Sequence, residues 1–201
     1  MIYGQLRTES QIYNSSLDRF LGRQQLPATW FANGGVDHLA IKTFNSGDYK
    51  AYLDSYKQYA ERITQTRLDG RYIATIRLLG NYSLTFNLLS VKSANRVTDL
   101  ELMLARPNEQ SELQPRLDHA EIYMKYGLIP VRKVLGNRGL RFEDHSNGSH
   151  EWVSVKFEDG AEEVKFSDRR LSEIMEEEID FGTAQVLYRR ENEGLQQTGA
   201  G

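Results

Sequence analysis

Two histidines in a repeated motif are the residues of this sequence best placed to do chemistry. The pattern Asp-His-x-x-Ile at positions 37–41 recurs at positions 118–122, so His38 and His119 occupy the same place in two copies of one motif. A repeat of this kind indicates two copies of one structural unit. Both motifs lie in runs typical of β-strands, in which successive side chains point to opposite faces of a sheet. We therefore expect both imidazoles to point to the same face.

A carboxylate is predicted beside these imidazoles. Residues 98–105 alternate between polar and apolar side chains, and leucines mark one face of this strand, which leaves Glu101 on the other face. Two neutral imidazoles and one carboxylate form the minimal ligand set of a catalytic divalent cation and leave coordination positions open for a substrate. The predicted ligands are therefore His38, His119 and Glu101, and the metal is zinc, iron, manganese or nickel, which these ligands do not distinguish.

Four more residues are candidates for roles beside the metal. Glu121 lies two positions after His119 on the same strand face, so it is a candidate catalytic acid or base, and its other roles would be a ligand or a partner that orients an imidazole. Arg71 and Arg77 are candidates to bind a substrate carboxylate, although long side chains on strands also extend along sheet edges. Trp152 is expected to line a substrate pocket or to fill the core.

The composition excludes several classes of protein. The 201 residues are 39% hydrophobic and 26% charged, as expected for an ordinary soluble globular chain. The chain has no cysteine, which excludes disulfides, thiolate metal sites and cysteine nucleophiles. A formal net charge of −3 argues against nucleic acid as a partner. The sequence shows neither a membrane-spanning apolar run nor a secretory signal, so a cytoplasmic location without a membrane partner is the expectation.

The order of predicted elements divides the chain into a helical segment, two similar β-rich units and a tail. Apolar residues at helical spacing predict helices over residues 10–26, 48–61 and 168–181. Ser10 and Ser167 are the expected N-caps of the first and last helix, Asp69-Gly70 predicts a hairpin, and residues 81–96 form an extended insertion. The predicted units are residues 1–32 (helical segment), 33–108 and 109–182 (two βαβββ modules) and 183–201 (C-terminal tail), within one compact unit.

The repeated histidine motif, together with residues 163–166 and the acidic helix after them, resembles the vicinal-oxygen-chelate superfamily, and within it the YecM-like group of metal enzymes. The superfamily includes glyoxalase-like isomerases, extradiol-type dioxygenases, epimerases and antibiotic-binding proteins. The resemblance implies an α+β fold in which two βαβββ modules pair into a curved mixed or antiparallel sheet, or cup, with a metal on its floor. It also implies a fourth ligand, a glutamate on the last strand of the second module. That strand face carries Glu163, Lys165 and Ser167, so the fourth ligand is Glu163 or, where Lys165 takes the position, no protein residue.

These observations together predict a divalent-metal-dependent enzyme of glyoxalase or extradiol-dioxygenase type that acts on a 2-oxo acid or another substrate with vicinal oxygens. Two alternatives remain open. One is a metal-free protein that binds a small molecule in the same cup, and the other is a protein-interaction domain that uses the N-terminal helix or residues 81–96. A small molecule is the expected partner, and a second copy of the chain is a possible one.

Overall fold

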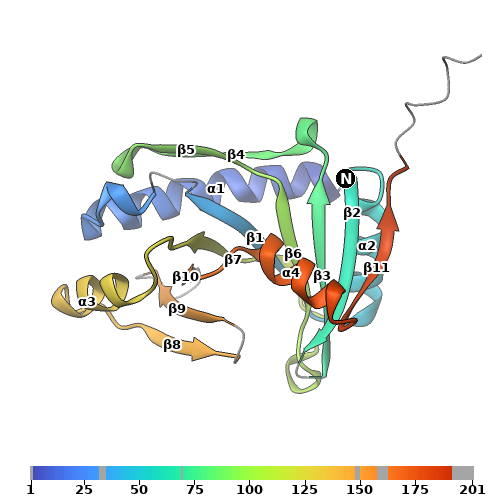
Figure 1. Cartoon of the computed structure of the whole chain (residues 1–201). Helices are drawn as coiled ribbons and strands as arrows, with labels where there is room; N and C mark the ends of the chain where they lie inside the picture. Colours follow the sequence, from blue (N-terminus) through green and yellow to red (C-terminus); the bar gives the residue numbers. More distant parts are fainter. Residues whose placement is uncertain (1, 32–34, 69, 148–149, 158–162, 192–201) are drawn as a thin grey trace, which may run out of the picture.

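A computed structural model describes residues 2–31, 35–68, 70–147, 150–157 and 163–191, which form a nine-stranded mixed sheet, a small two-stranded sheet and helices (Figure 1). The longer helices are α1 (Ile2–Gln24), α2 (Ser46–Tyr56), α3 (Ile129–Asn137) and α4 (Leu171–Asp180), and short 3-10 helices lie at Ala28–Trp30, Gly80–Tyr82, Leu89–Val91 and Pro107–Glu109. The strands are β1 (Val36–Thr43), β2 (Ala60–Leu68), β3 (Arg71–Leu78), β4 (Leu84–Leu88), β5 (Ser93–Val97), β6 (Asp99–Leu104), β7 (Arg116–Tyr123), β8 (Glu143–Ser146), β9 (Glu151–Lys156), β10 (Glu163–Ser167) and β11 (Ala184–Arg189).

Two units with the same strand order form most of the large sheet. The first module consists of β1, α2, β2, β3 and β6, with its strands in the spatial order β1-β6-β3-β2. The second consists of β7, α3, β8, β9 and β10, in the order β7-β10-β9-β8. In each module the first strand pairs in parallel with the last, and the modules join where β1 and β7 pair antiparallel. The predicted α+β fold with two βαβββ modules is confirmed.

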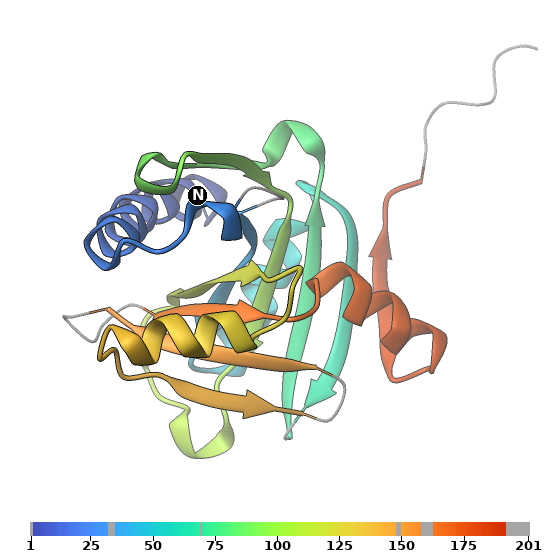
Figure 2. The ribbon, with the colours of Figure 1, turned by 60° about the vertical axis from the view of Figure 1, so that its left-hand side comes forward.

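One face of the large sheet packs against α1, α2 and α3 and forms the main hydrophobic core. Because side chains alternate along a strand, residues such as Leu39, Leu100 and Phe166 enter this core, and their neighbours point to the opposite face. We call that opposite face the inner face. It carries the predicted metal ligands, and Figures 1 and 2 show α4 on this side of the sheet and α1 on the other.

Helix α4 covers the part of the inner face that belongs to the first module. Arg62 and Thr66 lie on the inner face of β2, because they share a face with Thr64, the partner of Thr75. Arg62 forms an ion pair with Glu176 of α4. Thr66 Oγ1 donates a 3.2 Å hydrogen bond to the carbonyl oxygen of Thr183, three residues after this helix ends. The buried residues of α4 are Leu171, Ile174 and Met175.

The N-terminal helix is longer than predicted. The structure continues α1 back to Ile2, whereas the sequence pattern placed its start at Ser10. Ser10 is not a cap, because its Oγ donates a 2.9 Å hydrogen bond to the carbonyl oxygen of Arg7 inside the helix. The earlier start follows from Leu6, which is buried in the main core one turn before Ser10. Among the described helices, none combines the length and apolar character needed to cross a membrane.

The predicted insertion at residues 81–96 is a small hairpin that packs on α1. Strands β4 and β5 pair antiparallel and form the two-stranded sheet. Asn14 of α1 and Asn87 of β4 exchange two hydrogen bonds, of 3.3 and 3.0 Å, between side chain and backbone. Phe86 and Leu88 are fully buried against the main core, so this segment contributes to the fold itself.

Three further boundaries differ from the predicted ones. Helix α2 ends at Tyr56, because Ala60 already pairs with Leu78 as the first residue of β2. Helix α4 begins at Leu171, and Ser167, the predicted cap, is the last residue of β10. The predicted C-terminal tail contains β11, which pairs antiparallel with β2 at the edge of the sheet. Residues 192–201 of that tail lie outside the described residues.

Candidate metal centre

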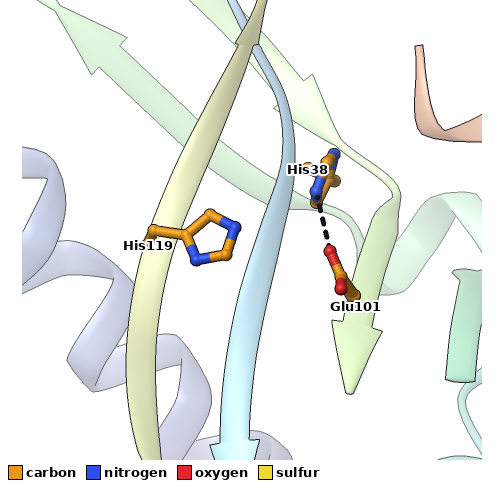
Figure 3. A group of neighbouring side chains, drawn as sticks. All are labelled: His38, Glu101 and His119. Atoms are coloured by element: carbon orange, nitrogen blue, oxygen red, sulfur yellow. Dashed lines mark ion pairs between the residues drawn. The ribbon is translucent and has the colours of Figure 1, made fainter. Parts of the chain in front are cut away.

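Three side chains from three neighbouring strands meet on the inner face. His38 of β1, Glu101 of β6 and His119 of β7 each offer a ligand atom, and these atoms lie within 4.8 Å of one another. His38 Nε2 lies 3.4 Å from Glu101 Oε2, and the two imidazole centroids are 6.3 Å apart. Figure 3 shows this ion pair and the ring of His119 directed toward it. The structure therefore brings together the three residues predicted as ligands.

The strand registers explain why these three residues meet. Ala40 pairs with Glu101 on the parallel side of β1 and with His119 on the antiparallel side. His38 lies two residues before Ala40 and so shares its face of the strand. Ala40 is fully buried, and its methyl group is small enough to leave room between the larger side chains. This role of Ala40 had no signal in the sequence.

An aspartate before each histidine holds its ring. Asp37 Oδ2 lies 3.2 Å from His38 Nδ1, and Asp118 Oδ2 lies 3.0 Å from His119 Nδ1. A carboxylate that accepts the Nδ1 proton leaves Nε2 as the ligand atom, as in carboxylate-histidine-metal sites. Both Nε2 atoms are buried without a hydrogen-bond partner in the described part of the chain. Sequence reasoning missed the two aspartates as orienting residues, although each recurs with its histidine in the repeated motif.

The centre concentrates negative charge around its imidazoles. Burial by itself lowers the pKa of His38, but nearby carboxylates, Glu121 foremost, outweigh burial and raise this pKa well above its ordinary value. Burial by itself raises the pKa of Glu101, but the ion pair with the imidazole of His38 outweighs burial and lowers this pKa to about 2. The arrangement therefore favours a positive charge at its centre, which a proton on His38 or a divalent cation supplies.

Other polar atoms on the inner face also lack partners. Besides the two imidazole nitrogens, the buried atoms without a hydrogen bond among the described residues include Thr75 Oγ1, Arg71 Nε and Glu178 Oε2. Thr75 pairs with Glu101, and Arg71 lies on the same face of β3. Burial, together with the charge of Glu101, raises the pKa of Glu178 on α4. Buried polar atoms are nearly always paired, so the unpaired hydroxyl of Thr75 beside Glu101 adds to the unpaired imidazole nitrogens as a sign of a bound ion, water or ligand.

Glu121 and Glu163 lie beside the ligand histidines without belonging to the ligand group. Glu121 pairs with His38 across β1 and β7, its side chain is buried, and its Oε2 lies 3.9 Å from His38 Nε2. Glu163 pairs with His119 across β7 and β10. Among the described residues, the group that could hold a metal consists of the three predicted ligands and contains neither glutamate.

Two predicted substrate-binding residues have partners within the chain. Arg77 forms a two-pronged interaction with Asp99, in which Nε donates to Oδ1 at 2.9 Å and Nη2 to Oδ2 at 3.2 Å. Trp152 stacks with the imidazoles of His145 and His150, at centroid distances of 5.2 and 5.0 Å. Substrate contact by Arg77 or Trp152 stays a prediction.

Comparisons with known proteins identify the fold. Neither a protein-family model nor a curated protein matches the sequence. Among solved structures, the chain is similar to a structural-genomics protein, EC4020, with a TM-score of 0.64 and 17% identity over 84% of this chain and 88% of that one. It is also similar to methylmalonyl-CoA epimerase from Mycobacterium tuberculosis, with a TM-score of 0.50 and 12% identity over 74% of this chain and 98% of that one.

At these identities the two similarities show a shared fold: the paired modules of this chain are arranged as in EC4020 and in this epimerase. Two paired βαβββ modules are the fold that the predicted superfamily implies. Membership of the YecM-like group stays a prediction.

Proposed function

We propose that the protein is a divalent-metal-dependent enzyme of glyoxalase or extradiol-dioxygenase type that acts on a 2-oxo acid or another small molecule with vicinal oxygens. One observation carries this proposal: His38, Glu101 and His119 offer three ligand atoms within 4.8 Å of one another, and the Nε2 atoms of both imidazoles are buried without hydrogen bonds in the described part of the chain. Two imidazoles and one carboxylate suit a first-row transition metal and leave positions for two substrate oxygens.

The chain's own residues prepare the centre for this chemistry. A divalent cation supplies Lewis-acid stabilisation of negative charge on a substrate oxygen. Asp37 and Asp118 hold the ligand rings, and burial excludes water around them. Glu121 is a buried carboxylate beside the ligand group, and we assign it the acid or base that moves a substrate proton at Oε2.

Metal content and thermal stability test this proposal. Protein purified without an affinity tag or chelator is expected to contain first-row metal. Addition of Mn²⁺ at about 100 times its Kd should add about 2.7 kcal/mol of stability, or about 5–10 °C in Tm. His38→Ala and His119→Ala should each abolish this gain. Loss of a residue that only hydrogen-bonds a metal ligand lowers metal affinity by up to roughly 100-fold, and loss of the ligand itself should lower it further. His145→Ala, which removes another inner-face imidazole, is the matched control and should keep the gain.

Absence of metal binding would indicate a different function for this site. If Mn²⁺, Fe²⁺, Ni²⁺ and Zn²⁺ all fail to raise Tm, and purified protein contains no metal, the proposed function is wrong. Ligand binding that ignores chelators and survives His38→Ala would then indicate a metal-free binding protein.

A further inference from the structure

Lys165 occupies the position in the second module that Glu101 occupies in the first. Ala40 and Glu121 each follow their motif histidine by two residues. Ala40 pairs with Glu101 across the parallel strands β1 and β6, and Glu121 pairs with Lys165 across the parallel strands β7 and β10. The neighbours of Lys165 in β10 enter the main core, so Lys165 itself points to the inner face. The internal symmetry of the fold thus directs Lys165 toward the centre that holds Glu101.

The ammonium group of Lys165 has no ion-pair partner among the described residues. Its Nζ lies 6.0 Å from the centroid of the Trp152 ring. Its positive charge nevertheless reaches the centre, since it contributes to the lowered pKa values of Glu101 and Asp118. The side chain is partly buried, so its ammonium group has lost part of its hydration and favours an anionic partner.

The two halves of the inner face differ in what covers them. Over the first module, α4 is held by the ion pair between Arg62 and Glu176 and by the hydrogen bond from Leu171 N to Asp37. The helix of the second module, α3, packs on the opposite face, where its Val131 and Leu135 enter the main core. Helix α4 thus covers the first module's part of the inner face, and the helix of the second module, α3, does not cover the part beside Lys165.

We propose that Lys165 binds an anionic oxygen of the substrate, so that the substrate is a carboxylate whose vicinal oxygens face the metal centre. This inference rests on the proposed function, because it takes the metal centre as given. A glutamate at this position would add a fourth ligand and cancel positive charge. A lysine leaves the coordination position open and adds a charge that selects an anion over an uncharged analogue of the same shape.

Pyruvate and its uncharged ester methyl pyruvate test this selection, because both carry vicinal oxygens and only pyruvate is an anion. Each is titrated into the Mn²⁺-loaded protein while water-proton relaxation reports displacement of water from Mn²⁺. The wild type should bind pyruvate at least about tenfold more tightly, as expected for one charge-assisted hydrogen bond. Lys165→Gln should remove this preference without loss of Mn²⁺ binding, and Lys165→Arg should keep it. Lys156→Gln is the matched control, since Lys156 of β9 is an exposed lysine that points to the inner face, as Lys165 of β10 does.

Lys165→Glu supplies a second test, because it places a carboxylate in the second module at the position equivalent to Glu101 in the first. This variant should bind Mn²⁺ more tightly than the wild type and should not bind pyruvate. Equal or undetectable affinities for the two probes in the Mn²⁺-loaded wild type, or an unchanged preference in Lys165→Gln, would overturn the role of Lys165 and leave the metal centre standing. A wild type that binds no Mn²⁺ would overturn the proposed function together with this inference, so the two failures are distinguishable.

Discussion

The two modules share one topology but present different side chains to the centre between them. The first module supplies His38 and Glu101, and α4 covers much of its inner face. The second supplies His119 and carries Lys165 where the first carries a carboxylate. Topology therefore sets the positions from which side chains reach the centre. The residue types at equivalent positions decide whether a position suits a cation or an anion.

The orienting aspartates show the same divergence. Asp37 accepts a 2.9 Å hydrogen bond from Leu171 N and pairs with Arg170 at 3.3 Å, so the first module links its ligand His38 to the start of α4. Its side chain is 8% exposed, whereas that of Asp118 is 21% exposed. Asp37 is thus both an orienting residue and an anchor for α4, and the variants below separate these roles.

The largest effect is expected where the modules meet, at Ala40. Ala40→Leu places a bulky side chain between Glu101 and His119. Mn²⁺ affinity should therefore fall by more than about 100-fold, which exceeds the loss caused by removal of a residue that only hydrogen-bonds a ligand. Overpacking should also cost about 1–3 kcal/mol of unfolding free energy. Calorimetric titration and denaturant unfolding measure the two effects. Ala40→Gly leaves the space open and should keep the affinity; equal loss in both variants would contradict the role of this space.

The next effect distinguishes the two aspartates. Asp37→Ala and Asp118→Ala should each lower Mn²⁺ affinity roughly 10–100-fold, because each releases a ligand ring. In the metal-free protein, Asp37→Ala should lower Tm more, because it also removes the hydrogen bond to Leu171 N, a bond to a charged group worth about 1.5–3 kcal/mol. Thermal melts with and without Mn²⁺ make the comparison. Equal Tm losses in the two metal-free variants would show that Asp37 does not anchor α4.

The charges of the centre predict a pH dependence of intermediate size. The pKa of His38 is raised in the folded chain, so its protonation stabilises the metal-free fold fully below its ordinary value of 6.5, and this contribution is lost as pH rises through the raised pKa. The lowered pKa of Glu101 contributes stability above its ordinary value of 4.5, which is lost as pH falls toward about 2.

A metal competes with the proton on His38, so the Tm gain from Mn²⁺ should increase from about pH 6 to about pH 8. Melting curves across this range, with and without Mn²⁺, measure it. In His38→Gln the metal-free protein should lose the decline in stability at higher pH. A gain from Mn²⁺ that shrinks as pH rises would contradict the assignment of His38 as a ligand.

The smallest effect on stability is expected from the ion pair that holds α4 over the first module. Arg62→Ala breaks the ion pair with Glu176, whose side chain is 55% exposed, so it should cost at most about 1 kcal/mol, or about 2–4 °C in Tm. Mn²⁺ affinity should not change. Lys50→Ala, which breaks the more exposed pair with Asp54, is the control and should lower Tm less. A large loss of Mn²⁺ affinity in Arg62→Ala would show that α4 supports the metal centre as well as covering it.

Much of this arrangement is visible in the sequence because it depends on local patterns. Alternation along residues 37–41, 98–105 and 118–122 places His38, Glu101 and His119 on one strand face, since side-chain direction follows from the period of two. The repeated motif identifies the two modules, and the structure confirms this fold. Helix ends were predicted less well, because the start of α1 and the end of α2 depend on packing and strand pairing elsewhere in the chain.

The features that sequence patterns did not reveal depend on which strands are neighbours and in which register. The backbone hydrogen bonds of one strand fit those of any other, so the partner is chosen by burial of the whole core rather than by either strand alone. Only the folded chain therefore places Ala40 between Glu101 and His119, pairs β11 with β2, and sets Lys165 across the centre from Glu101.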